Sequence, residues 1–171
     1  MIGCQLVARN DNDSPVEMSL LDRLLDDDPA ASQDPAKTRR KALEEFRDAL
    51  RRDLEALLNT RACSISWLRG LSELDTSILN YGVLTVTSAD LSAEDNRERL
   101  RSAVERAIRR FEPRFLRVNV TLVEDAERID RTLRFRIEAL AQAKPAPEPL
   151  VFDSVLDPST QGVVVSQPRD V

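Results

Sequence analysis

An acid and a base stand on either side of one proline, in the sequence Glu112-Pro113-Arg114. In an extended X-Pro-X segment the first and third side chains point to roughly the same side of the chain. Glu112 and Arg114 can therefore pair with each other, or present opposite charges to another molecule. The alternative is that the proline only stops a helix and that water solvates both charges. A partly buried ion pair would add little stability but could specify a partner or a register.

The residue types that most enzymes use are scarce in this chain. It has no histidine, two cysteines and four glycines. The commonest general base and the commonest neutral metal ligand are thus missing. The few cysteines and glycines give no zinc pattern, disulfide framework or phosphate loop. We expect Cys63 to be a buried apolar side chain, because no histidine can activate it, and Trp67 to be either core or a partner anchor. The sequence predicts no catalytic residue, cofactor or metal.

Paired carboxylates leave one enzymatic alternative, a glycosidase. Glycoside hydrolysis needs two carboxyl groups about 5–10 Å apart, one of them protonated in an apolar cleft. Glu112 is the acid that we expect to be most buried, and Asp153 could be the second. Arg114 beside Glu112 would favour the ionised carboxylate, however, whereas a general acid must hold its proton. The 30 acidic residues also make a coincidental pair easy to find.

The charge balance disfavours a nucleic-acid binder. The 30 acids outnumber the 25 bases and give a formal net charge of −5, whereas such a binder needs a basic surface. One tyrosine and five phenylalanines also offer few stacking platforms. No apolar run approaches the roughly 20 residues of a membrane helix, and no signal peptide is visible. We therefore expect a cytoplasmic protein that inserts into no membrane and uses its arginines for specific ion pairs with other proteins.

The Glu-Pro-Arg junction separates a predicted helix from a predicted strand. A capping box from Ser92 to Asp95 opens the helix, and Pro113 must end it, because proline has no amide hydrogen and clashes with the preceding turn. Its buried stripe is Leu100, Val104, Ala107, Ile108 and Phe111. Apolar and polar residues alternate along the strand. We expect one face to carry Leu116, Val118, Val120 and Leu122, and the other Arg117, Asn119 and Thr121.

Two further helices are predicted before the junction. The first runs from Thr38 to about Arg61, where a cation favours the helix end; its stripe is Leu43, Phe46, Leu50, Leu54, Leu57 and Leu58. The second covers 71–82, with a capping box from Ser72 and Gly82 as a left-handed stop. We expect its inward residues to be Leu74, Ile78 and Leu79.

Strands follow the junction. Residues 133–141 alternate between apolar and polar side chains, as 116–122 do. Residues 150–156 and 162–167 are predicted to form a hairpin or a loop-joined pair across Asp157-Pro158 and Gly162. The layout is α+β, with N-terminal helices packed on a small, mainly antiparallel sheet of three to four strands. Its exposed face carries arginines that are either a docking surface or ordinary solvated charges, and an open sheet edge could accept a partner strand.

The chain divides into an arm and a domain. Residues 1–37 form an N-terminal arm with a short helical pattern, and its leucine stripe is Leu20, Leu21, Leu24 and Leu25. The first 17 residues are polar and aperiodic, either a disordered extension or a misassigned start. Residues 38–167 form a single α+β domain.

Six stretches in this order resemble the small baseplate wedge family of contractile injection machines. That family comprises the type VI secretion baseplate protein TssE and its phage-tail relatives, also described as lysozyme-like. The likeness covers about residues 18–165. The six stretches are MSLLDRLL at 18–25, LEALLNTR at 54–61, LDTSILNYGV at 74–83, IRRFEPRFLRVNV at 108–120, LRFRIEALA at 133–141 and LVFDSVLDPSTQG at 150–162.

The resemblance implies a structural, non-catalytic subunit with an α+β fold. Its partners would be larger baseplate wedge subunits, with the sheath as a further candidate, in a sixfold baseplate docked at the inner membrane complex. Glu112, Pro113 and Arg114 would be the contact that holds the wedge together and supports sheath assembly. Arg61 would be a further interface residue, against the simpler reading that it only caps its helix.

Overall fold

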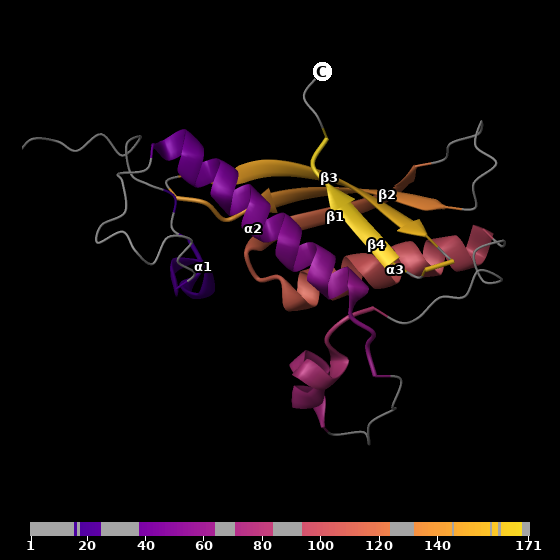
Figure 1. The fold of residues 1–171 in the computed structure, drawn as a ribbon. Coiled ribbons are helices and arrows are strands. Elements are labelled where there is room, and N and C mark those ends of the chain that lie inside the picture. Colours follow the sequence, from indigo (N-terminus) through magenta and orange to yellow (C-terminus); the bar gives the residue numbers. More distant parts are fainter. Residues whose placement is uncertain are drawn as a thin grey trace, which may run out of the picture.

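The computed structural model has an α+β fold, as predicted (Figure 1). It describes residues 16, 18–24, 38–63, 71–83, 94–123, 132–144, 146–157, 159–160 and 162–168. The helices are α1 (Leu20–Leu24), α2 (Arg39–Asn59) and α3 (Glu94–Phe111), with the short 3-10 turns η2 (Ser72–Thr76) and η3 (Ile78–Asn80). The strands are β1 (Phe115–Val123), β2 (Leu133–Ala141), β3 (Glu148–Asp157) and β4 (Gly162–Ser166). Some predictions concern residues outside the described ranges, namely Ser92, Trp67, Leu25 and most of the first 17 residues.

The four strands form one antiparallel sheet in the order β1-β2-β3-β4. In β2 every second side chain is buried, and the buried side chains of all four strands lie in one core with the stripes of α2 and α3. The predicted stripes are confirmed, from Phe46 and Leu50 in α2 to Val104 and Ile108 in α3. An amphipathic helix buries its apolar stripe against such a face. The opposite face, which carries Arg117, Arg136 and Glu138, stays exposed.

The start of β1 departs from simple alternation. The register shifts between Phe115 and Arg117, so Leu116 has no partner on β2. Phe115 is buried, whereas 51% of Leu116 is exposed. The prediction that Leu116 shares a face with Val118, Val120 and Leu122 is wrong, because a β-bulge inserts one extra residue and alternation resumes at Val118.

The segment 71–83 differs most from its prediction. Two short 3-10 turns replace the single helix, and no side chain caps the first of them. Ile78 and Leu79 are exposed, not inward, because a 3-10 turn has three residues and positions four apart do not share a face. Figure 1 shows this segment lying apart from the sheet. Cys63, predicted to be buried, is also exposed, because it lies beyond the end of α2.

The edge of β1 is covered by arginines of α3. Arg101 Nη1 donates to the Val120 carbonyl at 3.0 Å, and Arg109 Nη2 donates to the Val118 carbonyl at 2.8 Å. These carbonyls point away from β2, where an added strand would pair. The expectation of an open edge is therefore wrong at these two residues.

The arm helix α1 is confirmed as a helix but contributes no buried residue. Leu20, Leu21 and Leu24 are exposed, whereas Val16 just before it is buried in the core. Among the helices within the described ranges, none is both long and apolar enough to cross a membrane.

Candidate functional site

The Glu-Pro-Arg junction is a tight turn between α3 and β1. The Glu112 amide closes the last turn of α3 on the Ile108 carbonyl at 2.9 Å, and the Phe115 amide donates to the Glu112 carbonyl at 3.2 Å. The Arg114 carbonyl then accepts the Gln142 amide at 2.7 Å, which ties the junction to the end of β2. Pro113 is exposed, whereas Glu112 is 7% exposed. The helix ends at Phe111, as Pro113 requires.

Glu112 and Arg114 form a two-pronged ion pair. Arg114 Nε donates to Glu112 Oε1 and Nη2 donates to Oε2, both at 2.6 Å. The Arg114 amide also donates to Oε1 at 3.3 Å. Of the alternatives that the sequence left open for Glu112 and Arg114, the structure shows the pairing across the proline. The fork geometry of this contact explains why arginine stands here, since lysine cannot make it.

Asp53 of α2 is a third member of the site that the sequence did not reveal. Arg114 Nη2 donates to Asp53 Oδ2 at 2.6 Å, across 61 residues of sequence. Burial lowers the pKa of Arg114, but the hydrogen bonds to Glu112 and Asp53 outweigh it and raise the pKa above its ordinary value. Asp53 directly precedes the buried Leu54. Its position next to the apolar stripe of α2 is the only sequence feature that could have pointed to it as a site residue.

Arg52 extends the site to the arm. It donates to Asp53 Oδ1 at 3.1 Å and to Asp22 Oδ1 at 2.6 Å. The Asp22 side chain is 6% exposed. We call Asp22, Arg52, Asp53, Glu112 and Arg114 the charged cluster. It joins α1, α2 and the junction.

Tyr81 lies beside the charged cluster. Its ring packs edge-to-face on Phe111, with the ring centroids 5.3 Å apart. Burial raises the pKa of Tyr81, and the negative charges of Asp53 and Glu112 raise it further. The cluster therefore has a phenol at its margin.

Gly82 holds this segment against the end of α2. The Val83 amide donates to the Thr60 carbonyl at 2.9 Å. Gly82 has a φ of +113°, and a Cβ there would lie 2.2 Å from the Thr60 carbonyl oxygen. Only glycine fits such a position. The predicted left-handed role of Gly82 is confirmed, although it serves this close approach and not the stop of an α-helix.

Arg61 lies in a different place from the junction. It is exposed and forms a parallel bridge with Val83, just beyond the end of α2. The helix itself is capped by the Thr60 amide, which donates to the Leu57 carbonyl at 3.2 Å. Segment 81–83 connects the two places, since Tyr81 contacts Phe111.

The arrangement suits binding better than acid–base chemistry. Glu112 is held by Arg114, and Asp153, the other carboxylate of the glycosidase alternative, accepts Arg136 Nε at 2.9 Å on the exposed sheet face. Both carboxylates of that alternative are therefore already paired with arginines. Within the described part of the chain, no group of three histidine, cysteine or acidic side chains could hold a metal ion.

Comparison with known proteins gives one family. The family model of the baseplate wedge protein gp25 matches residues 44–146, which include Asp53, Tyr81 and the junction. One solved structure, described as "The baseplate complex from the type VI secretion system", contains a chain that is 17% identical, with a TM-score of 0.45. The match covers 66% of this chain and 94% of that chain. No curated protein matches the sequence with significance.

Proposed function

Since the chain belongs to the family of the baseplate wedge protein gp25, we propose that it is a non-catalytic structural subunit of a type VI secretion baseplate wedge. In this role it binds larger wedge subunits and supports assembly of the contractile sheath. It works in the cytoplasm, in a sixfold baseplate that docks at the inner membrane complex. Glu112, Pro113 and Arg114 make the central contact, and Arg61 makes a second one.

The charged cluster is the observation that carries this proposal. The Arg114 side chain is 22% exposed, and its Nε and Nη2 are occupied by Glu112 and Asp53. Among the hydrogen bonds of the described residues, none uses Nη1 of Arg114. A guanidinium carries donors on all three nitrogens, so no described residue takes up the donors of Nη1, and a partner can accept them. Pro113, the neighbour of Arg114 in the chain, is exposed at the surface.

The two carboxylates that bind Arg114 also lower the entropic cost of binding a partner. Asp53 and Glu112 hold the guanidinium in place before a partner arrives. Immobilising a flexible side chain on binding costs about 0.5–1.5 kcal/mol, and this cost is reduced here. An acid at a helix C-terminus is unfavourable by itself, so the paired Glu112 fits a role in holding Arg114 better than a role in stabilising α3.

Arg61 is the second proposed contact. Its side chain is exposed, and its bridge to Val83 places it next to the Gly82 segment. A partner that covers Arg114 and Tyr81 would have to follow this segment to reach Arg61. The two contacts would then lie on one continuous interface.

Co-purification with the larger wedge subunits tests the proposal. The chain is co-expressed with the wedge subunits encoded beside it, as wild type and as Glu112→Gln, Arg114→Gln and Arg61→Gln. We expect each junction variant to remain folded by circular dichroism and to lower recovery of the complex at least about tenfold. Arg110→Gln is the matched control, because Arg110 is exposed in the last turn of α3. Junction variants that recover the complex as well as Arg110→Gln does would end the proposal.

A further inference from the structure

The bulge at the start of β1 gives this chain an exposed apolar side chain next to the junction. Leu116 has no partner on β2 and is 51% exposed, while its neighbour Phe115 is buried. A β-bulge re-aims a side chain and is common beside functional sites. Leu116 lies two residues after Arg114, so it adjoins the contact proposed above.

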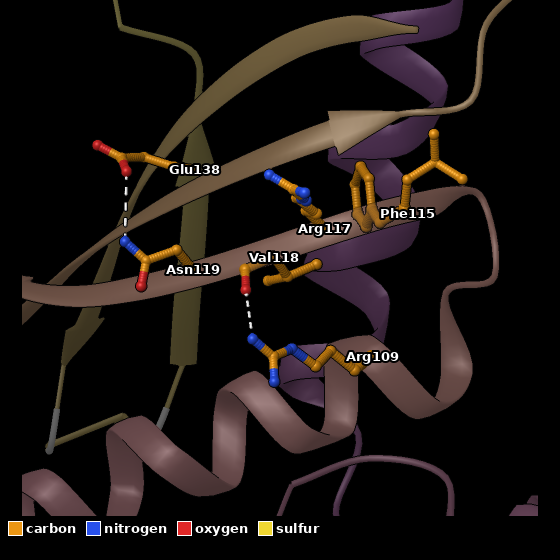
Figure 2. Close-up of a pocket in the computed structure, with 7 residues that line it drawn as sticks. Arg109, Phe115, Arg117, Val118, Asn119 and Glu138 are labelled. Atoms are coloured by element: carbon orange, nitrogen blue, oxygen red, sulfur yellow. Dashed lines mark hydrogen bonds between the residues drawn. The ribbon is translucent and has the colours of Figure 1, made fainter.

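A groove of about 570 Å³ surrounds this position. Three elements line it: Arg109 comes from α3, residues 115–119 come from β1, and Glu138 comes from β2. Figure 2 shows Arg109 reaching from its helix to the Val118 carbonyl, and Asn119 pointing toward Glu138. The groove is therefore formed by the end of α3 together with the first half of β1.

The charges in the groove are unbalanced. Two arginines, Arg109 and Arg117, line the groove together with a single acid, Glu138. Glu138 accepts a hydrogen bond from Asn119 Nδ2 at 3.3 Å. Arg109 is held by Glu105 and by the Val118 carbonyl. Within the described ranges, no ion pair or hydrogen bond involves the exposed Arg117 guanidinium. The described residues thus leave this cation without a partner, beside an exposed leucine.

Strand pairing is not available to an occupant at this point. The Val118 carbonyl, which an added strand would use, already accepts Arg109 Nη2 at 2.8 Å. An occupant must therefore be recognised through side chains. Apolar contact with Leu116 and carboxylates for the arginines are the two complementary features.

We infer that this groove is a second docking surface, which takes a short acidic and apolar segment of a larger wedge subunit. An apolar side chain of the segment packs on Leu116, and a flanking carboxylate pairs with Arg117. Arg109 stays on the Val118 carbonyl and adds positive potential. The inference rests on the proposed function, since the segment belongs to the subunit that contacts Arg114.

Binding of designed peptides to the full chain tests the chemistry of the groove. Two synthetic peptides share the same leucines, and carry either aspartate and glutamate or lysine at the other positions. We expect the acidic peptide to shift the NMR amide signals of Leu116, Arg117 and Glu138, and the lysine peptide to leave them in place. Equal binding of both peptides, or no shift at these amides with the acidic one, would overturn the inference.

Variants locate the contact. Leu116→Ser and Arg117→Glu should each lower the affinity for the acidic peptide at least about tenfold. Val164→Ser is the matched control, because Val164 is an exposed apolar residue of β4, 63% accessible. Since Leu116 is exposed, its replacement should not unfold the chain, and thermal melting checks this. Full binding by Leu116→Ser and Arg117→Glu would contradict the inference.

The same variants in the co-purification assay separate the two proposals. Loss of the complex with Arg114→Gln but not with Leu116→Ser and Arg117→Glu would remove the groove and keep the proposed function. Loss with the groove variants but not with Arg114→Gln would remove the junction as a contact and leave the groove as the surface that binds the wedge subunit. Loss in both sets is the result that we expect.

Discussion

The Asn59 carboxamide pairs with the main chain of Val163 in both directions. Its Nδ2 donates to the Val163 carbonyl at 2.8 Å, and the Val163 amide donates to its Oδ1 at 2.9 Å. Val163 lies on β4, an edge strand of the sheet. The side chain of Asn59 thus occupies the groups that an added strand would use. Arg101 and Arg109 of α3 do the same at the other edge strand, β1. Both sheet edges are therefore covered at these residues.

Replacing Asn59 should therefore loosen the β4 edge. Asn59→Ala removes two hydrogen bonds to Val163, and we expect it to lower the free energy of unfolding by about 1–2 kcal/mol. Urea denaturation measures this loss. The freed edge should also promote self-association, which light scattering at high protein concentration detects. Asn119→Ala, which loses a single 3.3 Å contact, is the control. An Asn59→Ala protein with wild-type stability and mass would contradict the edge role.

Gly82 should not tolerate a side chain. In Gly82→Ala the new Cβ meets the Thr60 carbonyl oxygen at 2.2 Å in a left-handed backbone. We expect a loss of about 2–3 kcal/mol in the free energy of unfolding, and displacement of Tyr81 from Phe111. In the control Gly162→Ala the Cβ meets, among the described residues, only the Thr160 hydroxyl at 3.3 Å, so the loss should be small. Equal effects at both positions would show that the contact with Thr60 is unimportant.

Tyr81 reports directly on Asp53, because it is the only tyrosine of the chain. Burial and the charges of Asp53 and Glu112 raise its pKa above the ordinary value. Asp53→Asn removes one negative charge, so the pKa of Tyr81 should fall toward that value. Titration of tyrosinate absorbance measures it. Glu44→Gln, which changes a surface acid of the same helix, should leave the pKa unchanged. An unaltered pKa in Asp53→Asn would place Tyr81 away from the cluster.

The contact between α1 and Arg52 should weaken in acid. Burial raises the pKa of Asp22, but hydrogen bonds from Ser19 and Arg52 and the charge of Arg52 outweigh it and lower the pKa below its ordinary value. A carboxylate with a lowered pKa stabilises the fold above the ordinary aspartate pKa of about 3.9, and this contribution is lost as the pH falls through the lower folded pKa.

NMR signals of the α1 amides should follow this loss. We expect them to shift in acid for the wild type, whereas Asp22→Asn should show the detached signals already at neutral pH. Signals of α1 that stay constant through the whole acid range would contradict the contact.

The helix stripes and the Glu112–Arg114 pair could be predicted, because both rest on local geometry. Four-residue steps such as Phe46 to Leu50 fix the buried face of a helix, and a proline fixes where α3 ends. The pair spans two residues, so no tertiary information was needed.

Asp53 and Leu116 could not be predicted, because each depends on distant partners. Asp53 is one of many charges on α2, and only the packing of α2 beside the junction selects it. Leu116 fits an alternating pattern, and only the pairing of β1 with β2 reveals the bulge. Asn59 was missed for the same reason, since Val163 lies 104 residues away.

The central claim is that Arg114, clamped by Glu112 and Asp53, contacts a larger wedge subunit. A cryo-EM map of the assembled baseplate tests it most directly, through the distance from Arg114 Nη1 to the nearest atom of a neighbouring chain. The account predicts a hydrogen-bond acceptor of that chain within about 3.5 Å. A junction surrounded only by solvent in the assembled particle would contradict it.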